Sequence, residues 1–221
     1  MAALSEAQPR ADEPRLLHAD AQLLVVDKPA GLLCVPGRGA DKQDCLSARM
    51  QACYTDALVV HRLDMATSGI CLMARGPQAQ RAMSRAFAQR EVGKRYEAVV
   101  HGLVAEDSGA IDLPIAADWP NRPLRIIDPV RGKPSLTRWQ VLARDTETGT
   151  TRLSLEPVTG RSHQLRVHLL AIGHAIVGDT LYVYGAPHQA EAPRLLLHAC
   201  DIRFAHPSTG EPLHFSSPSP F

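Results

Sequence analysis

A charged pair next to an apolar segment is the first candidate for chemistry in this sequence. Arg62 and Asp64 lie in the run HRLDMATSG at 61–69, which follows the apolar segment Leu58–Val60 and precedes the apolar segment Ile70–Met73. A carboxylate held beside an arginine at the end of a buried strand is costly to build and is typical of functional sites. Because side chains alternate along a strand, residues 62 and 64 are expected on one face. The pair therefore predicts a cleft at this strand end.

A second charged group lies on a predicted helix at Ser162–Ile172. Leu165, Leu169 and Ile172 would form its core-facing stripe, and Arg166 lies beside that stripe. An arginine near an apolar face needs an anionic partner or a path to solvent. Asp64 is a plausible partner, and such a pair would keep its carboxylate ionised despite burial. The alternative, in which Arg166 reaches water, is equally compatible with the sequence.

The positive charge is concentrated in two segments. Residues 75–95 contain six cations and one anion, and residues 158–174 contain two arginines, three histidines and no acid. This distribution fits a surface that faces phosphates, although a solvated helix face would also produce it. Tyr96, directly after the first segment, could stack on a base or belong to the core.

Several common site types have no support. His163 and His168 are five residues apart, a poor spacing for two metal ligands on one helix face. The sequence has no phosphate-binding glycine motif and no serine-hydrolase motif. Its five cysteines include no C-x-x-C pair, so we expect buried free thiols. We predict neither a metal nor a cofactor.

Composition indicates an ordinary soluble globular protein. The 221 residues are 45% hydrophobic and 21% charged, with a net charge of +1, and no apolar run is long enough to cross a bilayer. Residues 1–15 lack the features of a secretory signal. We interpret them as a disordered tail on a cytoplasmic protein, followed by one large domain or two small lobes over residues 16–221.

The pattern of predicted elements favours an α+β fold. Residues 28–31 form a turn, residues 109–134 are predicted to be irregular, and helices are expected at Asp44–Tyr54 with Asp44 as cap, at Pro77–Gln89, and at Ser162–Ile172 with Ser162 as cap and Gly173 as terminator. Strands are predicted at Gln22–Asp27, Leu32–Val35, Leu58–Arg62, Ile70–Ala74, Arg95–His101, Arg138–Ala143, Thr151–Leu155 and Leu195–Phe204.

Four motifs occur together in one known family. DKPAGL at 27–32, HRLDMATSG at 61–69, GRSHQLRVH at 160–168 and LLLHA at 195–199 follow one another in this order. From about Leu16 to Phe221 the chain resembles the RluA-type pseudouridine synthases. The resemblance implies a two-lobed domain with a mixed, mostly antiparallel central sheet flanked by helices and loops, and an active-site cleft across that sheet. It also implies isomerisation of uridine within RNA without metal or cofactor.

The resemblance also assigns residues. Asp64 matches the catalytic aspartate, Arg166 the basic residue paired with it, and Tyr96 the active-site aromatic. Arg62 resembles the side chain that enters the space left by a flipped base. Within Leu195–Leu197 we predict that Leu196 packs on the uracil. Further contacts to the RNA substrate are expected from Arg81, Arg85, Arg161 and His163.

The segment DWPNRP at 118–123 and the absence of an amino-terminal S4-like domain are similar to the short, dual-specificity subgroup of this family. That similarity implies action on uridine 32 of tRNA anticodon loops and uridine 746 of a large-subunit rRNA hairpin. The sequence has no obvious association motif, so we expect a monomer. One departure is Ala175, where the family usually has proline. The alternatives are a single-target synthase, a non-catalytic RNA-binding protein on the same fold, and a glycosidase that releases free base.

Overall fold

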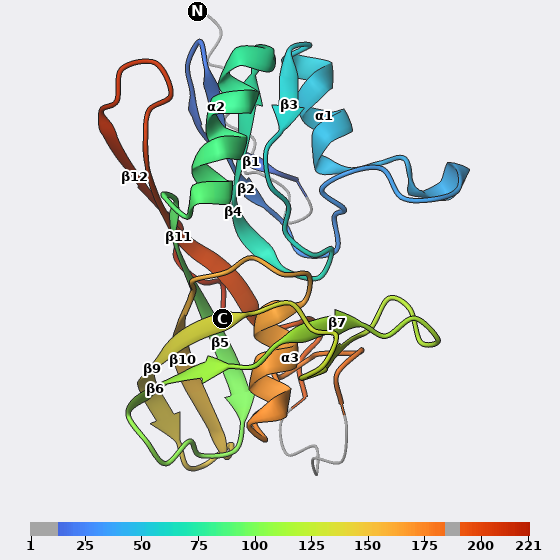
Figure 1. Ribbon diagram of the computed structural model, residues 1–221, viewed down its shortest axis with the longest axis vertical. Helices are drawn as coiled ribbons and strands as arrows, with labels where there is room; N and C mark the ends of the chain where they lie inside the picture. The colour runs from blue at the N-terminus through green and yellow to red at the C-terminus, as the bar shows by residue number, and fades with distance from the viewer. Residues whose placement is uncertain (1–12, 184–190) are drawn as a thin grey trace, which may run out of the picture.

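A single mixed sheet runs through the computed structural model, which describes residues 13–183 and 191–221 (Figure 1). The main path of the sheet has the order β1-β2-β4-β11-β5-β10-β9-β6, with β3 added to β4 and β12 added to β11. Its strands are β1 (Arg15–Ala19), β2 (Leu23–Lys28), β3 (Ala57–Val59), β4 (Ser68–Arg75), β5 (Gly93–His101), β6 (Ser108–Asp112), β9 (Leu136–Asp145), β10 (Thr150–Pro157), β11 (Leu197–Ala205) and β12 (Pro212–Ser216). The predicted α+β class is confirmed.

Helices and a small second sheet complete the fold. The helices are α1 (Leu46–Cys53), α2 (Gly76–Gln89), α3 (Gln164–Ala171) and the short 3-10 helix η1 (Ala40–Lys42), and the two-stranded sheet pairs β7 (Ile115–Ala117) with β8 (Arg125–Ile127). In Figure 1, β1–β4 with α1 and α2 form an upper lobe, and β6–β10 with α3 form a lower lobe. Strands β11 and β5 join the two lobes through the sheet.

The junction between the lobes depends on a glycine. Strand β11 pairs in parallel with β4 at His198–Ser68 and Ala199–Gly69. Gly69 has a φ of +111°, and a Cβ atom added there would lie 2.3 Å from the carbonyl oxygen of Ala199. Only glycine allows this close approach. The last residue of the 61–69 motif therefore lets the strands of the two lobes meet.

Both faces of the upper lobe's sheet are buried, which explains its continuous apolar runs. On β2, Leu24 and Val26 face the cluster that includes Met50 of α1, whereas Leu23 and Val25 face the cluster that includes Met83 of α2. Helix α2 keeps Met83 in the core and leaves its cationic side exposed, as its sequence predicts.

Three predicted element boundaries in the upper lobe are wrong. Strand β3 ends at Val59, so residues 60–67 form a loop rather than the end of a strand. Residues 32–35 are not a strand, since only Leu33 makes an isolated bridge, to Cys45. Asp44 does not cap α1; it binds the side chain of Arg49 instead.

The lower lobe contains further corrections. Residues 109–134 include β7, β8 and most of β6. Helix α3 begins at Gln164, not at Ser162, because the residue before it, His163, has a left-handed φ of 57°. His163 is therefore the N-cap in place of the predicted Ser162. Ile172 is 36% exposed and lies outside the core. The predicted end at Gly173, with a φ of +86°, is confirmed.

Two smaller predictions concern the tail and the thiols. Residues 1–12 lie outside the described residues, and Arg15 is already the first residue of β1. Cys53 is exposed, whereas Cys34, Cys45, Cys71 and Cys200 are buried free thiols as expected. None of the described helices is long and apolar enough to cross a membrane.

Candidate active site

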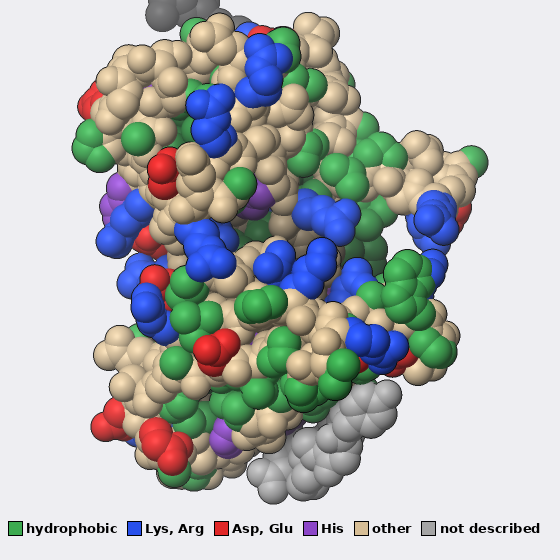
Figure 2. Space-filling view, in the orientation of Figure 1, with side chains coloured by type: hydrophobic (Ala, Val, Ile, Leu, Met, Phe, Trp, Pro, Cys, Tyr) green, Lys and Arg blue, Asp and Glu red, His purple; other side chains and the backbone are tan. Residues whose placement is uncertain are grey.

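A cavity of about 590 Å³ lies between the two lobes. Loop 60–67, the end of α2 with the segment leading into β5, and the segment between β10 and α3 border it. Figure 2 shows Lys and Arg side chains gathered along the hollow between the lobes. A volume of this order accommodates a small organic ligand.

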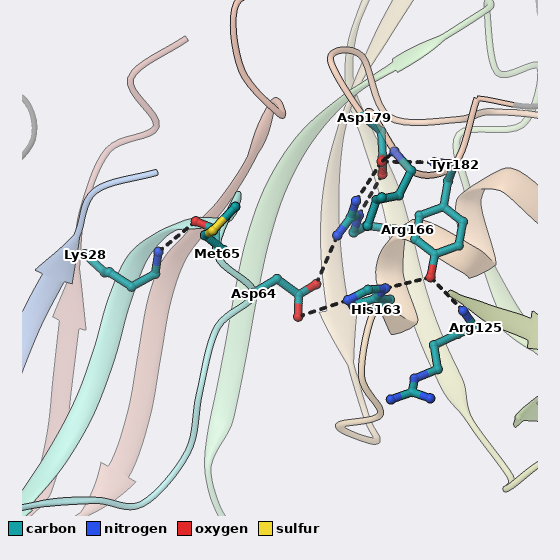
Figure 3. A network of polar contacts seen from close by, with 9 residues as sticks. Lys28, Asp64, Met65, Arg125, His163, Arg166, Asp179 and Tyr182 are labelled. Atoms are coloured by element: carbon teal, nitrogen blue, oxygen red, sulfur yellow. Dashed lines mark hydrogen bonds and ion pairs between the residues drawn. The ribbon is translucent and has the colours of Figure 1, made fainter. Parts of the chain in front are cut away.

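Asp64 reaches this cavity from a loop that is fixed by a buried lysine. Lys28 is fully buried, and its ammonium donates to the carbonyls of Pro29 (2.8 Å), Leu32 (2.8 Å) and Met65 (3.2 Å) (Figure 3). Within the loop, the backbone N–H of Thr67 donates to the carbonyl of Asp64 at 3.1 Å. The loop conformation is therefore fixed by contacts at the backbone of Asp64 and of Met65, which follows it.

Arg166 is buried behind Asp64 and contacts two carboxylates. Its side chain is 4% exposed, and its Nε and Nη2 donate to Asp179, each at 2.7 Å. Its Nη1 lies 3.5 Å from Oδ2 of Asp64. The predicted contact between Arg166 and Asp64 is confirmed, and the alternative path to solvent is wrong. The principal partner of Arg166, Asp179, was not predicted from the sequence. Its position just beyond the cation-rich segment at 158–174 could have identified it as a candidate ion-pair partner.

His163 faces the other oxygen of the Asp64 carboxylate. Its Nε2 lies 3.8 Å from Oδ1 of Asp64, and its Nδ1 lies 2.6 Å from the Tyr182 hydroxyl. Burial lowers the pKa of His163, and the cations Arg166 and Arg125 lower it further, whereas Asp64 and Asp179 raise it. His163 also has a φ of +57°, an uncommon conformation for a residue with a side chain. Such strain is common at functional sites.

Tyr96 lies at the boundary between the core and the cavity, so core packing is confirmed and stacking on a base stays a prediction. It packs against two core clusters and also lines the cavity. Burial raises the pKa of its hydroxyl, and the negative charge of Asp64 raises it further. The hydroxyl is therefore protonated at neutral pH and available as a donor.

The remaining predicted residues divide into two groups. Arg62 and Arg161 line the cavity, as His163 does. Arg81 and Arg85 are exposed on α2 and do not line the cavity.

In the leucine run at 195–197, the residue that lines the cavity is Leu197 rather than the predicted Leu196. Leu196 instead exchanges backbone hydrogen bonds with Val99 and Val177. Arg90 and Lys94 also line the cavity, and neither was predicted individually as a site residue.

A metal centre is not evident in the described part of the chain. There, no group of three or more His, Cys, Asp or Glu side chains is arranged to hold a metal ion. The polar groups around Asp64 are instead one arginine and one histidine, with a tyrosine hydroxyl in the same cavity.

Comparison with known proteins identifies the family of this site. The family model described as RNA pseudouridylate synthase matches residues 22–171. This chain belongs to that family. It is 47% identical over 206 residues to the dual-specificity RNA pseudouridine synthase RluA of Yersinia pestis, covering 93% of this chain and 99% of the relative. The RluA of Escherichia coli strain K12 is 45% identical, with 93% of each chain covered.

Solved structures agree with this assignment. The human protein described as RNA Pseudouridylate Synthase Domain Containing 1 superimposes with a TM-score of 0.78 at 29% identity, covering 97% of this chain and 87% of that one. The RluA-type resemblance and the pseudouridine synthase fold are therefore confirmed. The chain is an RNA pseudouridine synthase, an isomerase that acts on uridine in RNA.

Proposed function

We propose that Asp64 is the catalytic carboxylate of uridine isomerisation. The observation that carries this proposal is its placement: the carboxylate points into the inter-lobe cavity with Arg166 facing one oxygen and His163 facing the other. Isomerisation breaks the N-glycosidic bond and joins C5 of uracil to the sugar. An ionised carboxylate can bond to the anomeric carbon or take a sugar proton, and either role uses this position.

Three other cavity residues contact the substrate in the proposed reaction. Leu197 supports the uracil ring in place of Leu196, and the protonated Tyr96 hydroxyl donates a hydrogen bond or a proton. Arg62 is exposed at the cavity edge and enters the gap left by the flipped uridine. Extruding a base costs a few kcal/mol, and the inserted arginine offsets part of that cost.

Substitution of Asp64 by Asn tests the assignment. Asp64→Asn keeps the shape and removes the charge, so we expect pseudouridine formation to fall by about 10³-fold or more while RNA binding persists. Asp44→Asn is the control, because Asp44 is an exposed acid paired with Arg49 outside the cavity. Pseudouridine would be counted in a stem-loop RNA by mass spectrometry. Wild-type rates in Asp64→Asn would contradict the assignment, and release of free uracil by the native protein would favour a glycosidase.

We further propose that the RNA targets are a tRNA anticodon stem-loop and a large-subunit rRNA hairpin. The relatives described as dual-specificity synthases, at 45–47% identity, support this substrate range. We also propose that a monomer is the active unit, because the sequence has no obvious association motif. Pseudouridine mapping in a deletion strain would test the targets, since loss at a single site would establish a single-target synthase. Light scattering with and without RNA would test the monomer.

A further inference from the structure

Tyr182 lies directly behind the candidate active site and has no role in the scheme above. It is 2% exposed, and its hydroxyl accepts the backbone N–H of Arg125 at 2.9 Å. The same hydroxyl lies 2.6 Å from Nδ1 of His163, and the guanidinium of Arg166 lies 5.0 Å from the centre of its ring (Figure 3). Tyr182 therefore touches both residues that face Asp64.

The hydrogen bonds of this hydroxyl select one form of the histidine. A tyrosine hydroxyl has a single proton, and a neutral imidazole has one donor nitrogen and one acceptor nitrogen. The Tyr182 oxygen already accepts from Arg125, and His163 Nδ1 is the one acceptor that contacts it among the described residues. The hydroxyl proton therefore points to Nδ1. The imidazole proton then lies on Nε2, the atom nearest Asp64.

We propose that Tyr182 is a positioning residue for pseudouridylation, because its hydroxyl fixes His163 as the Nε2–H tautomer and aims that N–H at Oδ1 of Asp64. Arg166 faces Oδ2, so each carboxylate oxygen has its own donor. The separations of 3.8 Å and 3.5 Å are long for hydrogen bonds and are expected to shorten when substrate binds. This inference rests on the proposed catalytic role of Asp64.

A neutral imidazole is the form that this arrangement needs. A charged His163 would form a full ion pair with Asp64 and reduce its reactivity. The groups that face His163 are Asp64 on loop 60–67, Arg166 on α3, Arg125 on β8, and Asp179 and Tyr182 on the segment after α3. Burial and the two cations oppose a charge on the ring, which keeps His163 neutral near pH 7.

The first test removes the hydroxyl. Tyr182→Phe is expected to lower kcat on a stem-loop RNA by about 10-fold with little change in KM, the loss typical when a group that orients a functional ligand is removed. Tyr54→Phe is the matched control, since Tyr54 is a partly buried tyrosine outside the cavity. Thermal melting of both variants separates a loss of fold from a loss of positioning. An unchanged kcat in a folded Tyr182→Phe would overturn the proposal.

The second test replaces the histidine with two amides of different reach. The amide of Gln can place an N–H near the position of Nε2, whereas the shorter Asn reaches only the position of Nδ1. We therefore expect His163→Gln to retain several-fold more activity than His163→Asn. Adding Tyr182→Phe to His163→Gln should cost little more, because no tautomer remains to be fixed. Equal activities of the two amides, or full additivity of the double variant, would count against the proposal.

The third test reads the tautomer without catalysis. Nitrogen-15 NMR of the His163 ring should show Nε2 protonated in the wild type and in Asp64→Asn, and a mixture of tautomers in Tyr182→Phe. A protonated Nδ1 in the wild type would refute the inference even if Asp64 is catalytic. Conversely, an active Asp64→Asn variant would refute the proposed role of Asp64 whatever the NMR shows, so the two failures are distinguishable.

Discussion

Arg166 is held by two carboxylates of unequal importance. Asp179 binds it in a buried bidentate pair, whereas Asp64 lies farther away. Removing one partner of a buried ion pair leaves an uncompensated charge and typically costs 3–5 kcal/mol. We expect Asp179→Asn to lower the free energy of unfolding by about 3 kcal/mol in urea titrations. Asp107→Asn, which breaks the exposed pair with Arg144, should cost less than about 1 kcal/mol. Similar losses of unfolding free energy in the two variants would show that the buried pair stabilises the fold no more than the exposed pair does.

At the residue scale, motif residues were predictable and their supporting partners were not. Asp64, Arg166 and Tyr96 stand in recognisable runs and all reach the cavity region. Asp179 and Tyr182 reach it only because the chain returns after α3, which no local pattern encodes. Leu196 was preferred to Leu197 because strand register cannot be read from three consecutive leucines. A shift of one residue turns every side chain of a strand to the other face.

At the element scale, loop 60–67 depends on Lys28. Burial lowers the pKa of Lys28 from 10.5 to about 8, although nearby Cys34, Cys71 and Asp64 raise it. Between pH 8 and 10.5 the folded lysine is neutral while the unfolded chain still binds its proton, so this group adds stability as pH rises through that window. The Lys28→Met variant has no titrating group at this position and therefore lacks this pH-dependent contribution to the free energy of unfolding. The wild type should therefore gain up to about 3 kcal/mol of unfolding free energy over the variant between these pH values.

Urea titrations of both proteins at pH 7, 8, 9 and 10 check this expectation. Lys94, whose pKa is also lowered by burial, is present in both proteins and cancels in the comparison. The variant should be less stable at every pH, because Lys28 donates to three carbonyls as the ammonium and still to two of them as the neutral amine. Parallel stability curves would mean that Lys28 does not titrate in this range.

The same loop shows why one strand boundary was wrong. The apolar run continues past Val59, which favours a longer strand, but the chain leaves the sheet there. The next backbone N–H of β4, that of Leu72, donates instead to Nε2 of His61 at 2.9 Å. Burial lowers the pKa of His61 to about 3, so the ring is neutral and can accept. The His61 side chain thus takes the place of a neighbouring strand as the hydrogen-bond partner of Leu72. Hydrophobic periodicity in the sequence does not reveal such a contact.

At the scale of the whole molecule, the sequence predicted the class of fold but not how the two lobes meet. Alternating and continuous apolar runs identified most strands, and helix α2 was evident from its composition. The parallel pairing of β11 with β4 joins segments about 130 residues apart, and no pattern in the sequence predicted it. The cavity forms at this junction, so its lining could be assigned from motifs but not from local patterns.

The cations around the cavity predict how RNA binding depends on salt. Arg90 and Arg161 are exposed and line the cavity. Arg90 directly follows α2 of the upper lobe, whereas Arg161 precedes α3 of the lower lobe. If each contacts one phosphate, neutralising it releases counterions, and log Kd changes with log salt by about 0.7 per contact for single-stranded RNA. Arg90→Gln and Arg161→Gln should each reduce that slope by about this amount, and the double variant by about twice as much. Arg15→Gln is the control, because Arg15 on β1 is paired with Asp27 on β2 and does not line the cavity. Titrations of a labelled stem-loop at 50–300 mM salt, about the range where such slopes are measured, would decide the matter. Equal slopes in all variants would place the phosphates elsewhere.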